Sequence, residues 1–284
     1  MTAVADVTFE ATRRLIDTPD YQIQINDAGT GHPIFMIHGG GPGATGWSNF
    51  APNVAALSRK YRCIAVTMPG WGESCPQTIE TGRDGVEALR QLIDALEIPK
   101  AAFVGNSMGA AMAVGFTAAY PERVSHLVTM GLGNSGVAML SPAGPSEGFQ
   151  ILRQAYEDPS PERMKRLVQV MCFDPAMGSD ELAAQRSATA RKYSVHNENW
   201  LEILRSGPPL SLSDQALKSM SSWTVPTMLI HGRDDRVVHW EASLRLTAMV
   251  PNSRMVLLNR CGHWAQLEHA EEFNALVDSF LTYG

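Results

Sequence analysis

The sequence is poor in several features that mark other classes of protein. Its four cysteines, at positions 63, 75, 172 and 261, form neither a Cys-x-x-Cys pair nor a Cys/His group at zinc-ligand spacing. We therefore expect isolated thiols and no bound metal. No stretch is apolar enough to cross a bilayer, and the N-terminal residues contain no apolar core of signal-peptide type. These absences predict a cytoplasmic protein.

Positive charge is also scarce. The chain has 23 Lys and Arg against 29 Asp and Glu, which gives a formal net charge of -6. It thus lacks the basic surplus that holds a phosphate backbone, and nucleic acid is not an expected partner. With 44% hydrophobic and 18% charged residues over 284 positions, the composition is that of one large globular domain or a domain carrying an insertion.

Short apolar runs alternate with segments of helical periodicity along most of the chain. The runs are uninterrupted, as in strands covered on both faces, so the alternation predicts an α/β fold with a mostly parallel sheet and helices on both faces. The predicted strands are residues 21–26, 34–37, 63–68, 101–104, 124–130, 227–230 and 255–258. The predicted helices between them are residues 85–96, 108–120, 241–250 and 270–281. The residues before 21 are expected to be irregular.

This alternation breaks once, between residues 133 and 222, where the strand-like runs disappear. The segment reads as amphipathic helices separated by Pro and Gly, for example residues 161–170 and 180–192. We interpret it as a helical cap inserted between two parts of one core, residues 1–132 and 223–284. Ligands of such sheets bind beyond the carboxyl ends of the strands, so the cap should roof the site and exclude water.

The strongest chemical signal is Gly105-Asn106-Ser107-Met108-Gly109, which stands between a predicted strand and a predicted helix. Glycines on both sides permit the sharp turn of a nucleophile elbow, which exposes the Ser107 hydroxyl above the sheet. A glycine-rich turn with a capping serine would give the same five residues. The elbow interpretation therefore depends on finding a base and an orienting acid.

Both partners follow in the chain. Asp235 and His263 each come shortly after a predicted strand, and the order Ser, Asp, His is that of α/β-hydrolases. We expect His263 to act as the base and Asp235 to orient it. Asp235 is favoured over Asp234 because the acid of such hydrolases normally lies three residues after the glycine of this strand-end motif. Asp234 remains an alternative, as do a capping role for either aspartate and a purely structural His263.

The sequence from His38 to Gly43, HGGGPG, follows another predicted strand and can supply donors to an oxyanion. Backbone N–H groups of consecutive glycines approach a ligand closely, and we expect Gly41, then Gly40, to act together with the N–H of Met108. A loop needed only for chain reversal is the simpler alternative. A nucleotide phosphate loop is excluded because no Gly-Lys-Ser/Thr ending follows.

Over nearly its whole length, the sequence resembles a known family, the meta-cleavage product hydrolases of bacterial aromatic degradation. The resemblance is carried by four motifs: HGGGPGATGWSNF (38–50), GNSMG (105–109), GRDDRVV (232–238) and CGHWAQLEHAEEFN (261–274). It implies an α/β-hydrolase fold without a cofactor. It also implies a substrate with a 2-hydroxy-6-oxohexa-2,4-dienoate core, whose C5–C6 bond is cut by water.

The same resemblance implies the polar contacts to the dienoate end of the substrate. Carried over residue by residue, these are Asn49, Asn106, Arg186 and Trp264, beside Gly40 and Gly41. Arg186 lies on a predicted cap helix, where its guanidinium would bind the substrate carboxylate in a bidentate manner. By pattern alone an arginine on a helix is a surface residue, and Arg191 is the alternative ligand.

Several points stay open. Ala110 and His239 depart from the family pattern, which usually has glycine and proline there. The same triad would also serve a carboxylesterase or lactonase, and a ligand-binding receptor built on a hydrolase scaffold, with slow turnover, is a further alternative. Haloalkane dehalogenases and epoxide hydrolases carry aspartate at the position of Ser107, which argues against both. The resemblance implies a homodimer or a multiple of dimers. The group attached to C6 of the substrate is not specified, although methionines 139, 164, 171 and 177 are candidates for its pocket.

Overall fold

The computed structural model describes residues 7–78, 84–133, 139–141, 145–206, 212 and 214–284. In this part of the chain, eight strands form one sheet in the order β1-β2-β4-β3-β5-β6-β7-β8. From β4 to β8 all neighbours are parallel, and β2 pairs antiparallel with both β1 and β4. The strands are β1 (Arg13–Asp17), β2 (Gln22–Ala28), β3 (Pro33–Ile37), β4 (Arg62–Thr67), β5 (Ala101–Asn106), β6 (Val124–Met130), β7 (Thr227–Gly232) and β8 (Ser253–Leu258).

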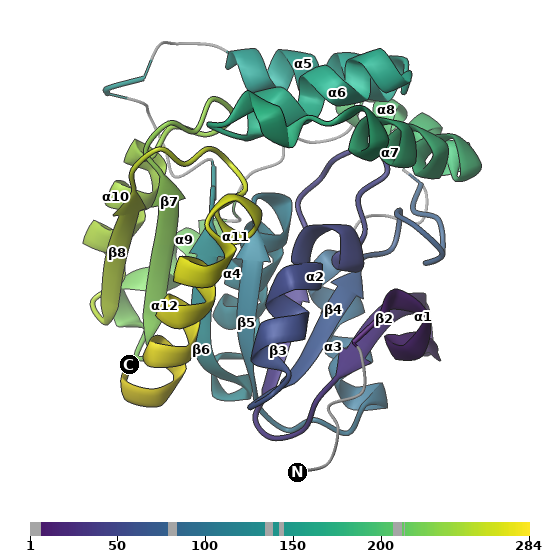
Figure 1. The fold of residues 1–284 in the computed structure, drawn as a ribbon. Helices are drawn as coiled ribbons and strands as arrows, with labels where there is room; N and C mark the ends of the chain where they lie inside the picture. Colours follow the sequence, from purple (N-terminus) through teal and green to yellow (C-terminus); the bar gives the residue numbers. More distant parts are fainter. Residues whose placement is uncertain (1–6, 79–83, 134–138, 142–144, 207–211, 213) are drawn as a thin grey trace.

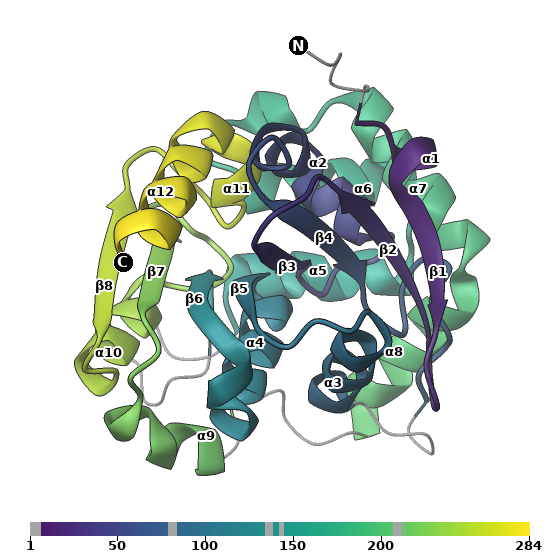
Figure 2. The ribbon, with the colours of Figure 1, turned by 90° about the horizontal axis from the view of Figure 1, so that it is seen from below.

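Helices cover both faces of this sheet, as the alternating pattern predicts (Figures 1 and 2). One face packs against α3 (Gly85–Ala95), α4 (Met108–Ala119), α9 (Asp214–Ser219) and α10 (Glu241–Met249). The other packs against α2 (Gly46–Leu57), α11 (Ala265–Glu268) and α12 (Ala270–Tyr283). Every residue of β5 is buried, because this central strand contacts helices on both sides. The fold is therefore that of an α/β-hydrolase.

Three elements differ from the predictions. The segment expected to be irregular contains α1 (Phe9–Thr12) and β1, whose backbone pairs with β2. Helix α2 was not predicted, since Gly46 and Pro52 both disfavour a helix interior. It forms because Thr45 and Ser48 make a reciprocal capping box and because its apolar side, including Phe50, is buried on the sheet.

The predicted cap region contains a helical layer that lies above the carboxyl ends of the strands (Figure 1). Its helices are α5 (Glu147–Glu157), α6 (Pro161–Met171), α7 (Asp180–Lys192) and α8 (Ser194–Ser206). The last helix before β7, α9, packs instead beside α4 of the core. Of the range 133–222, residues 134–138, 142–144, 207–211 and 213 lie outside the described residues.

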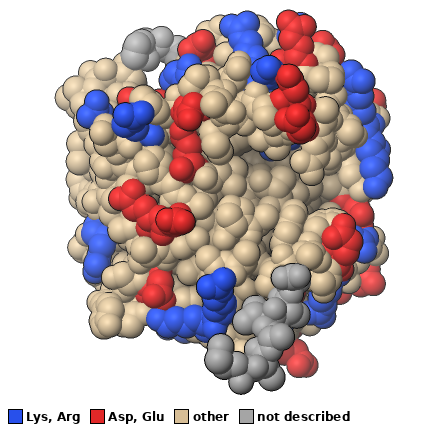
Figure 3. Space-filling model, viewed as in Figure 1, with Lys and Arg blue, Asp and Glu red and all other residues tan. Residues whose placement is uncertain are grey.

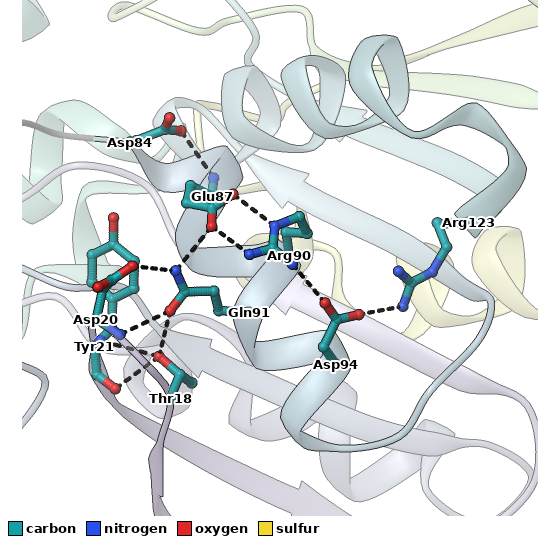
Figure 4. Close-up of polar contacts among 9 residues, drawn as sticks. All are labelled: Thr18, Asp20, Tyr21, Asp84, Glu87, Arg90, Gln91, Asp94 and Arg123. Carbon is teal, nitrogen blue, oxygen red and sulfur yellow. Dashed lines mark hydrogen bonds and ion pairs between the residues drawn. The ribbon is translucent and has the colours of Figure 1, made fainter.

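Side-chain hydrogen bonds fasten α3 to its surroundings (Figure 4). Asp84 caps the helix by accepting from the N–H of Glu87, and Gln91 bonds to Asp20 and Thr18 in the turn between β1 and β2. Arg90 and Asp94 continue the network, and Asp94 pairs with Arg123 in the 3₁₀ helix Pro121–Arg123. These contacts fix one edge of the molecule and are remote from the strand ends that build the site.

Charges on the face shown in Figure 3 are of both signs and are dispersed around a largely uncharged centre. That face carries no continuous basic patch. In the described part of the chain, none of the helices is long and apolar enough to span a membrane.

Candidate active site

Ser107 stands at the turn between β5 and α4, with φ 55° and ψ -114°. This backbone conformation is unfavourable for a residue with a side chain, and it is the strained geometry of a nucleophile elbow. The flanking glycines are required sterically: a Cβ on Gly105 would lie 2.5 Å from the carbonyl oxygen of Gly109, and one on Gly109 would lie 2.2 Å from that of Ile37. The N–H of Ser107 donates to the carbonyl of Met130 at 2.7 Å, which joins the turn to β6.

His263 and Asp235 meet beside this turn. The imidazole Nδ1 lies 2.7 Å from Asp235 Oδ2, and both side chains are buried. Because a carboxylate only accepts, Nδ1 carries the proton, which leaves Nε2 of the neutral ring free to take one. His263 and Ser107 line the same pocket, so the loops after β5, β7 and β8 converge there.

The Asp235 carboxylate has four donors around it. Its Oδ1 accepts the N–H groups of Val237 and Val238 at 2.7 and 2.9 Å, and its Oδ2 faces both His263 and, at 3.2 Å, Nε2 of His231. Burial alone would raise the pKa of Asp235, but the two imidazoles outweigh it, and the pKa lies below its ordinary value. This aspartate is therefore ionised.

His231 was not singled out from the sequence. Its Nε2 also faces the carbonyl of Val238 at 2.9 Å, so Nε2 carries the proton and Nδ1 accepts from the Ser243 hydroxyl at 2.7 Å. Asp234, the alternative acid, uses its N–H to bond the carbonyl of Cys261, and the structure shows no bond between its side chain and His263.

The glycine loop after β3 forms the wall on the other side of Ser107. Gly40 and Gly41 line the pocket, and Met108, as the first residue of α4, has an N–H without an intrahelical acceptor. The loop is held by His38, whose Nδ1 bonds the carbonyl of Gly39 while Nε2 accepts from the N–H of Met68. Burial lowers the pKa of His38 to about 4, so this ring is neutral.

The four predicted substrate contacts all line this pocket. Asn106 donates to the carbonyl of His263 at 3.1 Å, and its buried Oδ1 has no partner. Asn49 donates to the carbonyl of Thr45 at 3.2 Å. Trp264 is buried, and the guanidinium carbon of Arg186 lies 5.1 Å from the centre of its ring.

Arg186 reaches the pocket from α7 and is 4% exposed. Its Nη2 donates to the carbonyl of Pro42 at 3.3 Å; among the residues that the structure describes, its Nε has no partner and no carboxylate pairs with it. Burial lowers its pKa to about 10, so it remains charged at neutral pH. The alternative ligand, Arg191, is exposed and does not line the pocket.

The pocket is completed by apolar residues, of which the sequence indicated Met171 alone. They come from α5, from α6 and from the loop after β7: Phe149, Leu152, Leu167, Met171, Val237 and Val238. Of the four candidate methionines, Met171 lines the pocket, Met164 and the partly buried Met177 pack in the core of the cap, and Met139 is exposed. Within the described ranges, His, Cys, Asp and Glu side chains form no group of three that could hold a metal ion.

The end of α6 is fastened to the loop that carries His263. The N–H of His263 donates to the carbonyl of Met171 at 2.6 Å, and the Glu268 carboxylate accepts from the N–H groups of Gly262, Phe173 and Asp174. Glu268 is a second residue that sequence reasoning missed, because a glutamate in a short helix has no distinctive pattern. These hydrogen bonds join the C-terminal end of α6 to the loop that carries His263.

Comparison with known proteins agrees with this geometry. The model of the alpha/beta hydrolase fold family matches residues 32–270. A 2-hydroxy-6-oxononadienedioate/2-hydroxy-6-oxononatrienedioate hydrolase of Cupriavidus pinatubonensis is 39% identical over 98% of both chains. A 2-hydroxy-6-oxo-6-phenylhexa-2,4-dienoate hydrolase of Burkholderia cepacia is 38% identical over 93% of both chains.

Among solved structures, a meta-cleavage product hydrolase from Pseudomonas fluorescens IP01 (CumD) superimposes with a TM-score of 0.84 at 30% identity, over 95% of this chain and 97% of the other. The likeness therefore extends over core and cap together. The chain belongs to the α/β-hydrolase fold family and, within it, to the meta-cleavage product hydrolases.

Proposed function

We propose that this enzyme uses Ser107, His263 and Asp235 to hydrolyse the C5–C6 bond of a 2-hydroxy-6-oxohexa-2,4-dienoate. The observation that carries the proposal is the buried guanidinium of Arg186, which shares a pocket with Ser107 and has no carboxylate partner in the described structure. An unpaired charge of this kind is costly unless a ligand supplies the counterion, and the C1 carboxylate of a dienoate does so.

The reaction has two stages. The dienol first takes a proton at C5 and loses the proton of its 2-hydroxyl group, which gives a ketone at C2, a C3–C4 double bond and a C6 carbonyl that is no longer conjugated. His263 Nε2 then removes the Ser107 proton, and the alkoxide attacks the C6 carbonyl, whose oxygen is stabilised by the N–H groups of Met108 and Gly41, with Gly40 beside them.

Cleavage of the C5–C6 bond releases a carbanion that is delocalised onto the C2 oxygen. That oxygen takes the proton held on His263, and the fragment leaves as a 2-hydroxypenta-2,4-dienoate. Water, deprotonated by His263, then frees the carboxylic acid from Ser107. Asp235 stabilises the imidazolium in both steps. Every group in this scheme belongs to the chain itself, and the helical cap over the strand ends keeps bulk water out.

Two substrates and one pair of variants test the proposal. Wild-type enzyme is expected to bleach a yellow ring-fission dienoate far faster than it hydrolyses p-nitrophenyl acetate; the reverse preference would indicate an esterase. Ser107→Ala should lose turnover of the dienoate yet still bind it, which a spectral shift on mixing detects. Ser222→Ala, at an exposed position outside the pocket, is the control and should turn over normally. Turnover by Ser107→Ala at the wild-type rate would exclude Ser107 as nucleophile.

The family further favours a homodimer or a multiple of dimers in the cytoplasm. Sedimentation velocity of the purified protein and fractionation of the producing cell test these two points. A purely monomeric protein, or activity outside the cytoplasm, would contradict them.

A further inference from the structure

The two walls of the pocket differ in charge, and the order of the strands places them on opposite sides of Ser107. Ser107 follows β5. The loop after β3, on one side, carries Gly41 and contacts Arg186, whereas the loop after β7, on the other side, carries Val237 and Val238. Helix α5 joins the second wall: a Cβ on its Gly148 would lie 2.6 Å from the Val237 side chain.

The wall beyond Ser107 has no cation to offer a ligand. Among the described residues that line the pocket, Arg186 is the sole Lys or Arg, and it belongs to the first wall. Arg236, the nearest arginine in the β7 loop, donates its guanidinium to the carbonyls of Gln169 and Cys172. The segments of the cap region outside the described residues, 134–138, 142–144, 207–211 and 213, contain no Lys, Arg or His in their sequence.

The charged side chain that follows Val238 in this loop is a carboxylate. Glu241 accepts from the N–H groups of Met139, Leu140 and Ser141, and its partner His239 lies 3.8 Å away. Residues 239–241, which follow Val238, include this carboxylate and no arginine or lysine.

A dienoate bound with its C1 carboxylate on Arg186 and its C6 carbonyl at Ser107 must direct its C6 substituent to the second wall. Seven relatives at 37–40% identity are named for a dienedioate, whose substituent ends in a carboxylate, and one at 38% is named for a 6-phenyl dienoate, whose substituent is apolar. Because the two kinds occur at the same identity, the charge of this wall is the observation that bears on the C6 substituent.

We propose, on the basis of the proposed function, that this enzyme is selective for ring-fission products with an uncharged, apolar C6 substituent and rejects the dienedioates. Burying an unpaired carboxylate against Val237 and Val238 removes its hydration and supplies no counterion. The second carboxylate would also compete for Arg186, which binds one anion.

A matched pair of substrates tests the effect of the second carboxylate alone. 2-Hydroxy-6-oxonona-2,4-dienoate and 2-hydroxy-6-oxonona-2,4-dienedioate have the same nine-carbon chain and differ at C9, where one ends in a methyl group and the other in a carboxylate. We expect kcat/KM, followed by loss of visible absorbance, to favour the monoacid by about 100-fold. Equal rates, or faster cleavage of the dioate, would overturn the inference while leaving the proposed function intact. Cleavage of neither compound would refute the proposed function itself.

A pair of variants at one position tests whether the charge of the second wall sets the preference for the monoacid. Phe149 lines the pocket from α5 and is 42% exposed, so a polar substitution there does not bury a charge in the core. Phe149→Lys should reduce the monoacid preference at least tenfold, because it adds the missing cation. Phe149→Met, of similar length and uncharged, should leave the preference as in the wild type. If lysine and methionine have the same effect, charge on this wall does not set the selectivity.

Discussion

Replacing Arg186 should weaken catalysis and strengthen the fold. Burial lowers the pKa of this guanidinium from its ordinary value to about 10, which corresponds to a cost of roughly 3 kcal/mol in the unliganded protein. The folded state releases this proton at lower pH than the unfolded chain does, so the cost is fully present below about pH 10 and is relieved only above it. At neutral pH the whole penalty therefore applies.

The change Arg186→Met removes that penalty and keeps an unbranched side chain. It also removes the contact with the Trp264 ring and the hydrogen bond to Pro42, together worth about 2 kcal/mol. We expect the free energy of unfolding to rise by about 1 kcal/mol, and the melting temperature by about 2–4 °C. Differential scanning calorimetry at pH 7 measures both.

Catalysis should change in the opposite direction and in a substrate-dependent way. Loss of the carboxylate partner costs about 3 kcal/mol, or roughly 100-fold in kcat/KM for a dienoate. Hydrolysis of p-nitrophenyl acetate, which has no carboxylate, should be unchanged. Arg186→Lys keeps the charge without the planar fork and should fall between wild type and Arg186→Met for the dienoate. An Arg186→Met enzyme that is less stable and loses both activities equally would show that the guanidinium has a structural role.

Two further substitutions and one labelling experiment test other parts of the structure. Asp235→Asn should lower kcat for the dienoate roughly 10⁴-fold with an unchanged circular dichroism spectrum, since an amide does not hold the Nδ1–H tautomer of His263; near-normal turnover would exclude Asp235 as the acid. Glu268→Gln should reduce the free energy of unfolding by about 1 kcal/mol and lower kcat more than it alters KM, because one N–H group that now donates to Glu268 loses its acceptor. An unchanged kcat would show that catalysis does not depend on the hydrogen bonds of Glu268. Cys75, which is half-buried, should be the one thiol that reacts rapidly with Ellman's reagent in the native protein, since burial raises the pKa of the other three, to about 12 for Cys63 and Cys172 and also above its ordinary value for Cys261. Fast reaction of a second thiol would contradict this.

The sheet was largely predictable from sequence because its central strands are buried on both faces and read as unbroken apolar runs. The strand β6, for example, has the predicted bounds Val124–Met130. Strand β1 was missed because it lies at the edge, where Leu15 is partly exposed and the ladder to β2 supplies the order that the side chains do not. Helix α2 was missed because its stability comes from burial and capping, which offset the effect of Pro52.

The site was predictable where chemistry demands particular residues at the ends of strands. Ser107, Asp235 and His263 stand in motifs whose spacing is imposed by the turn each must make, and the structure brings all three loops to one pocket. Glu268 and His231 had no such signal, because they act through backbone and side-chain contacts that exist only after folding. The pocket-lining role of Phe149 was not predictable either, since its helix α5 has the pattern of any amphipathic segment.

The burial of Arg186 does not follow from the sequence pattern of α7. Residues 180–192 were predicted to form an amphipathic helix, and the buried side of α7 consists of Ala183, Arg186, Ser187 and Ala190, which are small residues and one charge. By pattern alone, the arginine on such a helix is expected on its solvated side. Burial arises because the small residues let α7 approach the glycine loop closely enough for the guanidinium to reach the carbonyl of Pro42. A charge enclosed in this way lowers stability, and a protein retains it where a bound anion makes use of it. The local conflict between sequence and burial is thus itself an argument for the carboxylate site.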